Sequence, residues 1–259
     1  MTKIYGMIGY TILYNSLLFP NTEILIISDM HDEPVKNCSP YKQINIENLL
    51  NKYIDFGYKI LLEEIPNKKE LIPLFPDSEH VNNTRQFYLK NFDKIIGFDI
   101  RLDLIDITVL ENSSVPLITH FVGLFEFFMI KSKLFELPIV KKYYLKMLLK
   151  FNKFINHYKD QLKYTYAKIN KIIFQKLVKN LNDLLSDIIE FYCFCRLFVE
   201  LKENKINKFV INCGLYHAEK LINLIKKYLH YSTKKKDGIN TINETNYNSN
   251  EMCIDMFEF

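Results

Sequence analysis

Histidines and carboxylates follow four apolar stretches of this chain, and these residue types activate water or bind metal ions in proteins. Each stretch is short and bounded by polar or turn-forming residues. In chain order, the candidates are Asp29 and His31 after ILIIS (24–28), Glu63 and Glu64 after YKILL (58–62), Asp99 and Arg101 after KIIG (94–97), and His217 after FVINCG (209–214). Four groups of ionisable residues in equivalent positions suggest one shared site rather than four separate surface features.

The elements that must position these residues read as strands alternating with helices. Apolar runs at 4–13, 24–28, 58–62 and 95–100 alternate with helix-like segments at 45–56 and 81–91. This alternation is typical of an α/β sheet that is mixed or mainly parallel. In such sheets ligands bind in the crevice beyond the carboxyl ends of the strands, so we expect the four groups to converge there.

The middle of the chain changes period. From about residue 117 to 203 the apolar residues recur three and four positions apart, as in long amphipathic helices. A strand at 208–214 and a helix at 218–229 then resume the α/β pattern. We therefore predict an α/β core at 1–116, a long all-helical insertion at 117–206, the last strand and helix of the core at 207–231, and a disordered polar tail with an apolar end at 232–259.

The residue types alone leave three chemistries open. Two histidines and a carboxylate can bind a divalent metal ion and lower the pKa of its bound water to about 7. Without a metal, a histidine oriented by a carboxylate can act as a general base, with Arg101 stabilising an oxyanion or holding an anionic group. Histidine can also bind haem without catalysing a reaction.

The motifs around these residues resemble those of the superfamily that groups erythromycin esterases, Tiki proteases, TraB-type proteins and haem-binding ChaN-type lipoproteins. That superfamily has a strand leading into GExH, a second strand ending in Glu, and a late strand ending in GxxH. Here SDMH (28–31) places Ser28 and Asp29 at the Gly and Glu positions and retains His31. LLEE supplies Glu63, and GLYH (214–217) keeps the GxxH pattern with His217.

The resemblance implies a hydrolase, esterase-like or resembling a metal-dependent protease, with a small-molecule or peptide substrate. His31, Glu63 and His217 would form its centre, with Asp29 and Arg101 as further catalytic residues. His31, His217 and Glu63 would be the ligands of a divalent metal such as Mn²⁺, Co²⁺ or Zn²⁺. Haem is the alternative cofactor, for a non-catalytic ligand-binding protein of the same fold.

Three further residues are candidates for contacts with a substrate. Glu64 and Asp99 adjoin the predicted centre, and Arg196 lies in the apolar helical run IIEFYCFCRLF (188–198). A buried arginine requires an anionic partner. Arg196 therefore either reaches the crevice or pairs with Glu200 four positions along its own helix.

IISDMH also resembles the first metal-binding motif of calcineurin-type metallophosphoesterases. Those enzymes require further motifs of the forms GDxxD, GNH and GHxH. The chain has seven glycines and contains none of these motifs. The sequence therefore favours the first resemblance.

Charge is segregated along the chain. Between Lys131 and Lys179 there are thirteen lysines against Glu136 and Asp160, a net +11; since the whole chain is +4, the remainder is −7. A basic helical interaction protein with a vestigial site is therefore a third alternative. The lysines have no arginine among them and match no binding motif, which favours a solvated helix face over a nucleic-acid surface.

Composition indicates a globular protein, with 48% hydrophobic and 25% charged residues. The first twenty residues lack the pattern of a secretory signal, and no apolar stretch is long enough for a transmembrane helix. The five cysteines are scattered and odd in number, which is typical of reduced core thiols. We expect a cytoplasmic protein; its oligomeric state is left open.

Overall fold

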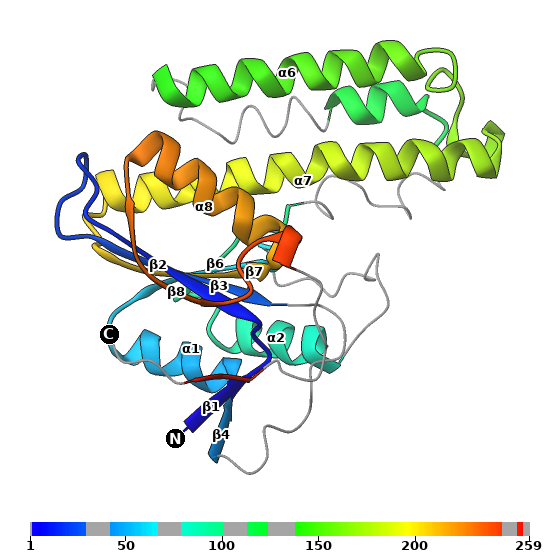
Figure 1. The fold of residues 1–259 in the computed structure, drawn as a ribbon. Helices are drawn as coiled ribbons and strands as arrows, with labels where there is room; N and C mark the ends of the chain where they lie inside the picture. Colours follow the sequence, from blue (N-terminus) through cyan, green and yellow to red (C-terminus); the bar gives the residue numbers. More distant parts are fainter. Residues whose placement is uncertain are drawn as a thin grey trace. The chain divides into compact units, whose positions relative to one another are not determined.

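In a computed structural model of the chain, the described residues are 2–29, 42–66, 79–100, 113–123, 138–244 and 253–255 (Figure 1). They divide into two compact units. One comprises Met1–Asp99 together with Arg196–Phe259, and the other comprises Ile100–Cys195. The first unit contains the strands and the second is helical, whereas the sequence placed the helical segment at 117–206.

A six-stranded sheet forms the centre of the first unit and confirms the predicted α/β class. Four neighbouring strands run parallel, β2 runs antiparallel to β3, and β8 runs antiparallel to β2. In spatial order the strands are β6 (Ile95–Gly97), β5 (Lys59–Leu62), β7 (Lys208–Gly214), β3 (Glu23–Asp29), β2 (Gly9–Tyr14) and β8 (Ser232–Gly238). The strand that closes the chain's α/β pattern, β7, therefore lies between two early ones.

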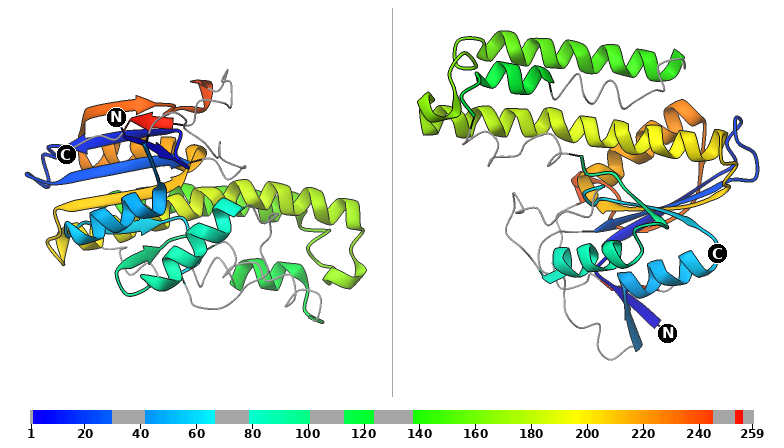
Figure 2. Two further views of the ribbon diagram at one scale, coloured as in Figure 1. Left: turned by 90° about the horizontal axis from the view of Figure 1, so that it is seen from below. Right: turned by 180° about the vertical axis from the view of Figure 1, so that it is seen from behind.

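The sheet is covered on both faces, with α1 (Ile46–Asp55) and α2 (Glu79–Lys90) on one side and α8 (Leu215–Leu229) on the other (Figures 1 and 2). Parallel strands buried on both faces read as continuous apolar runs, as β3 and β7 do. The α1 face includes Ile27, Leu62 and Val210, which pack against apolar residues of α1. Strand residues on this face alternate with residues that face α8.

A second, three-stranded sheet corrects one expectation. The run 4–13, predicted as one strand, divides at Gly6, whose φ of 91° falls in the region that favours glycine. The residues before it form β1, which pairs with other partners than β2 does. The small sheet has the order β4 (Lys42–Asn45), β1 (Thr2–Tyr5) and β9 (Cys253–Asp255).

The helical unit contains α6 (Pro138–Tyr158) and most of α7 (Lys171–Lys202), with a short 3₁₀ turn, η1 (Tyr166–Lys168), between them. Residues 117–123 are also helical. The predicted three-and-four spacing forms the core, with Leu177, Leu181, Leu185 and Ile188 of α7 packed against α6 residues such as Phe151. None of the helices in the described ranges is long and apolar enough to span a membrane.

The predicted disordered tail is wrong for its first part. Residues 232–238 form β8, which pairs along β2, and a 3₁₀ turn, η2 (Ile242–Glu244), follows. Every side chain of β8 is exposed, and exposed positions favour polar residues. The composition of β8 therefore resembles that of a disordered segment. Its backbone nevertheless completes the sheet, and lysines on an exposed edge strand discourage further pairing.

Candidate functional site

The carboxyl ends of β3, β5 and β7 lie side by side and carry most of the described candidate residues. Asp29, the last residue of β3, is level with Gly214, the last residue of β7. Glu63 follows β5, and its backbone N–H donates to the carbonyl of Asn212 at 3.0 Å. The topology therefore brings together residues from distant parts of the sequence, as expected for a parallel sheet.

Glu63 and His217 form a buried pair. The distance from His217 Nε2 to Glu63 Oε1 is 3.4 Å, and the two side chains are 8% and 3% exposed. The other oxygen, Glu63 Oε2, accepts the backbone N–H of Gly214 at 2.8 Å. Both oxygens of one carboxylate are thus engaged by residues 151 or more positions away in the chain.

The start of α8 explains why Glu63 tolerates burial. Gly214 is the N-cap of this helix, and it has no side chain to accept a hydrogen bond from the first turn, which also lacks acidic residues. A helix N-terminus favours negative charge because its first N–H groups point outward. Glu63 supplies that charge from the loop after β5, and His217 lies within the first turn of the same helix.

The second predicted carboxylate, Asp29, faces the other side of the sheet. Ile27 lies on the α1 face and is level with Asn212, so strand alternation places Asp29 and Asn212 on that face too. Asn212 Nδ2 donates to Asp29 Oδ2 at 3.0 Å, and both residues are buried. Sequence reasoning missed Asn212, although an asparagine inside the apolar strand KFVINCG is a visible signal.

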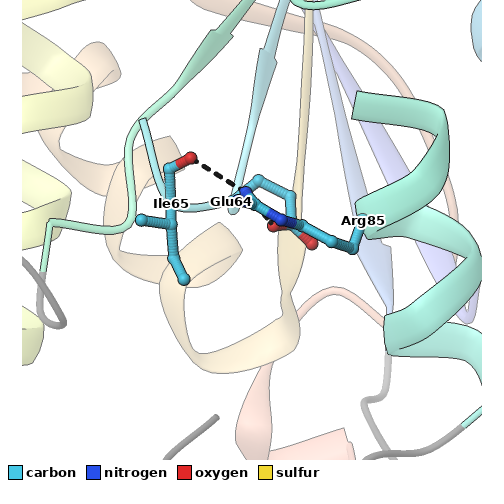
Figure 3. Close-up of polar contacts among 3 residues, drawn as sticks. All are labelled: Glu64, Ile65 and Arg85. Carbon is cyan, nitrogen blue, oxygen red and sulfur yellow. Dashed lines mark hydrogen bonds and ion pairs between the residues drawn. The ribbon is translucent and has the colours of Figure 1, made fainter. Parts of the chain in front are cut away.

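Glu64 pairs with Arg85 of α2, at 3.3 Å between Arg85 Nη1 and Glu64 Oε2 (Figure 3). The same nitrogen donates to the carbonyl of Ile65 at 3.1 Å. Burial raises the pKa of the Glu64 carboxyl to about 7, and the Arg85 guanidinium opposes that rise. Glu64 was predicted to bind substrate, and here it binds an arginine that no sequence motif singled out.

The remaining candidates are spread over other positions. Asp99 is half-buried and donates its backbone N–H to the Glu64 carbonyl at 3.0 Å. Arg196 pairs with Glu200 within α7 at 3.8 Å, the alternative that the sequence left open. His31 and Arg101 lie outside the described residues.

A metal ion would need more ligands than the described part of this site supplies. No group of three or more histidine, cysteine, aspartate or glutamate side chains suited to a metal occurs among the described residues. Catalytic zinc sites use three protein ligands. Glu63 and His217 supply two of the three expected ligands, and the third, His31, is outside the described residues.

The lysine-rich helices present their charges outward. Lys141, Lys153, Lys176 and Lys179 are exposed. Lys163 pairs with Asp160 at 2.9 Å, and both side chains are exposed. Exposed pairs of this kind contribute little to stability. Cys193, Cys195 and Cys213 are buried, as predicted for core thiols, and none of these three forms a disulfide.

No protein-family model, curated protein or solved structure matches this chain. The resemblance stated above therefore depends on the short motifs around His31, Glu63 and His217. The geometry of the site does not depend on this resemblance. A carboxylate and a histidine from distant segments of the chain meet at the carboxyl ends of the parallel strands β5 and β7.

Proposed function

We propose that this protein is a hydrolase in which His217, oriented by Glu63, activates water for attack on an ester or amide carbonyl. The 3.4 Å contact between His217 Nε2 and Glu63 Oε1 carries the proposal. A histidine held by a buried carboxylate is the usual arrangement for a general base. The place of the pair in the fold, beyond the ends of β5 and β7, supports the proposal further.

The two ring nitrogens of His217 have different roles in this mechanism. When Nε2–H faces Glu63, the neutral imidazole has its acceptor lone pair on Nδ1. Nδ1 takes a proton from water while the water oxygen bonds to the carbonyl carbon. Glu63 stabilises the imidazolium that forms, and Nδ1–H then gives its proton to the departing alcohol or amine as the acyl bond breaks.

The length of the contact between His217 and Glu63 agrees with that of a catalytic pair in an enzyme without bound substrate. At 3.4 Å the contact is longer than an ordinary N–H···O hydrogen bond of about 2.9 Å. Catalytic hydrogen bonds are often long in the free enzyme and tighten when the substrate binds. Glu63 itself is held by the Gly214 N–H, so His217 is the partner expected to move.

A bound divalent metal, held by His31, His217 and Glu63, would supply a water of lower pKa at the same place. The steps above use only the residues of this chain and need no metal. Metal content separates the two versions, since metal measured on purified protein should fall in His217→Ala if this residue is a ligand.

The test is hydrolysis of p-nitrophenyl esters and of a fluorogenic peptide by wild type, His217→Ala and Glu63→Gln. Loss of a general base costs about 10²–10⁴-fold in kcat. His157→Ala, which replaces an exposed histidine of α6, is the matched control and should retain wild-type activity. Hydrolysis that survives in His217→Ala would refute the proposal, and a Soret band on haem addition that is lost in the same variant would favour the ligand-binding alternative.

A further inference from the structure

The loop that follows β5 is held in place by an arginine on α2. Arg85 Nη1 contacts two consecutive residues of this loop, the Glu64 carboxylate at 3.3 Å and the Ile65 carbonyl at 3.1 Å (Figure 3). The Arg85 side chain is 17% exposed, and its guanidinium lies 5.4 Å from the centre of the Tyr88 ring. A planar guanidinium can bond two acceptors at once, which a lysine ammonium does with less geometric control.

The backbone of the same loop is bent tightly at Glu63. The Glu64 N–H donates to the Leu62 carbonyl at 2.7 Å, a three-residue turn of the kind found at strand ends. Beyond the bend, the Asp99 N–H donates to the Glu64 carbonyl at 3.0 Å. The turn therefore sends the Glu63 side chain toward α8 and the Glu64 side chain toward α2.

Gly97 shows how closely the loop is packed. A Cβ at this position would lie 2.7 Å from the Glu64 carbonyl oxygen and 3.0 Å from the Pro66 Cα. Real Cβ atoms essentially never come closer than 3.0 Å to a neighbour, so the first of these contacts would force a shift and the second is tighter than most. The loop is thus supported from β6 as well as from α2, and it has little room to rotate about the bend.

We propose that Arg85 is a positioning residue that, by binding Glu64 and Ile65, holds the bend so that Glu63 faces His217. The catalytic role of Arg85 in this inference rests on the proposed function. The contacts by which Arg85 holds the loop do not depend on it. Arg85 contacts the loop on the α2 side of the sheet, and the Glu63–His217 pair lies on the α8 side. Its influence on His217 passes through the backbone of residues 63–65.

A purely structural arginine would neutralise Glu64 and stabilise the fold without affecting the His217 ring. A positioning arginine changes the ring's hydrogen bonding when it is removed. The state of the ring is visible by ¹⁵N NMR of histidine-labelled protein near pH 8, because the two ring nitrogens differ in chemical shift according to which one carries the proton. This readout requires no substrate and no activity.

The experiment compares wild type, Glu63→Ala, Arg85→Met and Arg85→Lys. We expect the Nε2–H tautomer of His217 to predominate in wild type and to lose its predominance in Glu63→Ala. Arg85→Met should shift the tautomer ratio in the same direction as Glu63→Ala, and Arg85→Lys should recover part of the wild-type ratio. Arg196→Met, which breaks an arginine–glutamate pair within α7, is the matched control and should leave the His217 signals unchanged.

The outcomes separate the two proposals. If Glu63→Ala leaves the His217 tautomer unchanged, the Glu63–His217 pair and the proposed function both fail. If Glu63→Ala changes it and a folded Arg85→Met does not, the positioning role of Arg85 is overturned while the proposed function stands. If Arg85→Met does not fold, Arg85→Lys decides. A lysine does not hold Glu64 and Ile65 with the geometry of a guanidinium, so a wild-type tautomer ratio of His217 in Arg85→Lys would also overturn the positioning role. Where ester hydrolysis is measurable, Arg85→Met should lower kcat at least tenfold with KM nearly unchanged.

Discussion

Glu63 and Glu64 are adjacent in sequence, yet their carboxylates pair on opposite sides of the sheet. Glu63 contacts His217 of α8 at 3.4 Å, and Glu64 contacts Arg85 of α2 at 3.3 Å. Successive side chains of an extended chain point to opposite faces, and the bend at Glu63 preserves this separation. The two acids therefore have different environments and different expected roles.

The first prediction concerns the pH dependence of stability at Glu64. Burial raises the folded-state pKa of Glu64 from its ordinary value of 4.5 to about 7, so its stabilising contribution is complete below about pH 4.5 and is lost as pH rises through 7. Glu64→Gln removes this titration. The variant should gain stability relative to wild type between pH 5 and 8, by roughly 3 kcal/mol at most, since one pKa unit corresponds to about 1.4 kcal/mol.

Urea unfolding of both proteins at pH 5, 6, 7 and 8 measures that difference. Glu203→Gln, which changes an exposed glutamate at the end of α7, is the control and should show no such trend. A difference between Glu64→Gln and wild type that stays constant over this range would contradict the assignment.

The second prediction concerns the hydrogen bond between Asn212 and Asp29. Asn212→Leu keeps the approximate volume and removes the amide that donates to Asp29 Oδ2 at 3.0 Å. Because the carboxylate stays buried, we expect a loss of about 1–3 kcal/mol in the free energy of unfolding. Asn180→Leu, which removes an exposed amide bonded to Tyr158, should cost less. Equal losses in chemical denaturation would show that burial of Asp29 does not depend on Asn212.

The third prediction concerns Gly97. Gly97→Ala places a methyl group 2.7 Å from the Glu64 carbonyl oxygen and 2.8 Å from Tyr88 Oη. Relieving this overlap displaces the loop after β5, so we expect a lower melting temperature and, if the proposed function holds, weaker hydrolysis. Gly123→Ala is the matched control, because nothing in the described part of the chain lies within 4 Å of its added Cβ. A Gly97→Ala variant as stable and active as Gly123→Ala would be inconsistent with the described packing.

The fourth prediction concerns the segment expected to be disordered. Truncation after Tyr231 removes β8 and exposes the backbone edge of β2, and it also removes Asn240, which accepts a hydrogen bond from buried Thr11 at 2.8 Å. We expect the truncated protein to unfold at lower temperature and to aggregate, as exposed edge strands do. Lys236→Thr should remain folded, because its side chain is exposed and the backbone forms the pairing. A soluble truncated protein with an unchanged melting temperature would show that the segment after Tyr231 is dispensable for the fold.

Much of the fold could be predicted because burial leaves a periodic record in the sequence. The runs that form β3, β5 and β7 are mostly apolar, since both faces of the sheet are covered. The three-and-four spacing of α7 follows from one face packing into the helical core. Both patterns arise from local geometry, so one sequence is sufficient to detect them.

The errors have a different physical origin. β8 is held by backbone hydrogen bonds to β2, and backbone pairing leaves no mark on exposed side chains such as Lys235 and Lys236. The division of the run 4–13 into β1 and β2 depends on which distant strands pair with each half. Neither fact is present in local periodicity.

The sequence by itself determined the α/β class, the apolar strands and the residue types that follow them, including Glu63 and His217. Only the tertiary structure decided how those residues pair. The register of β5 and β7 brings Glu63 to the start of α8, and the packing of α2 brings Arg85 to Glu64. The reason is that residue spacing specifies the direction of a side chain within its own element, whereas its partner is chosen by strand order and helix packing between segments far apart in the chain.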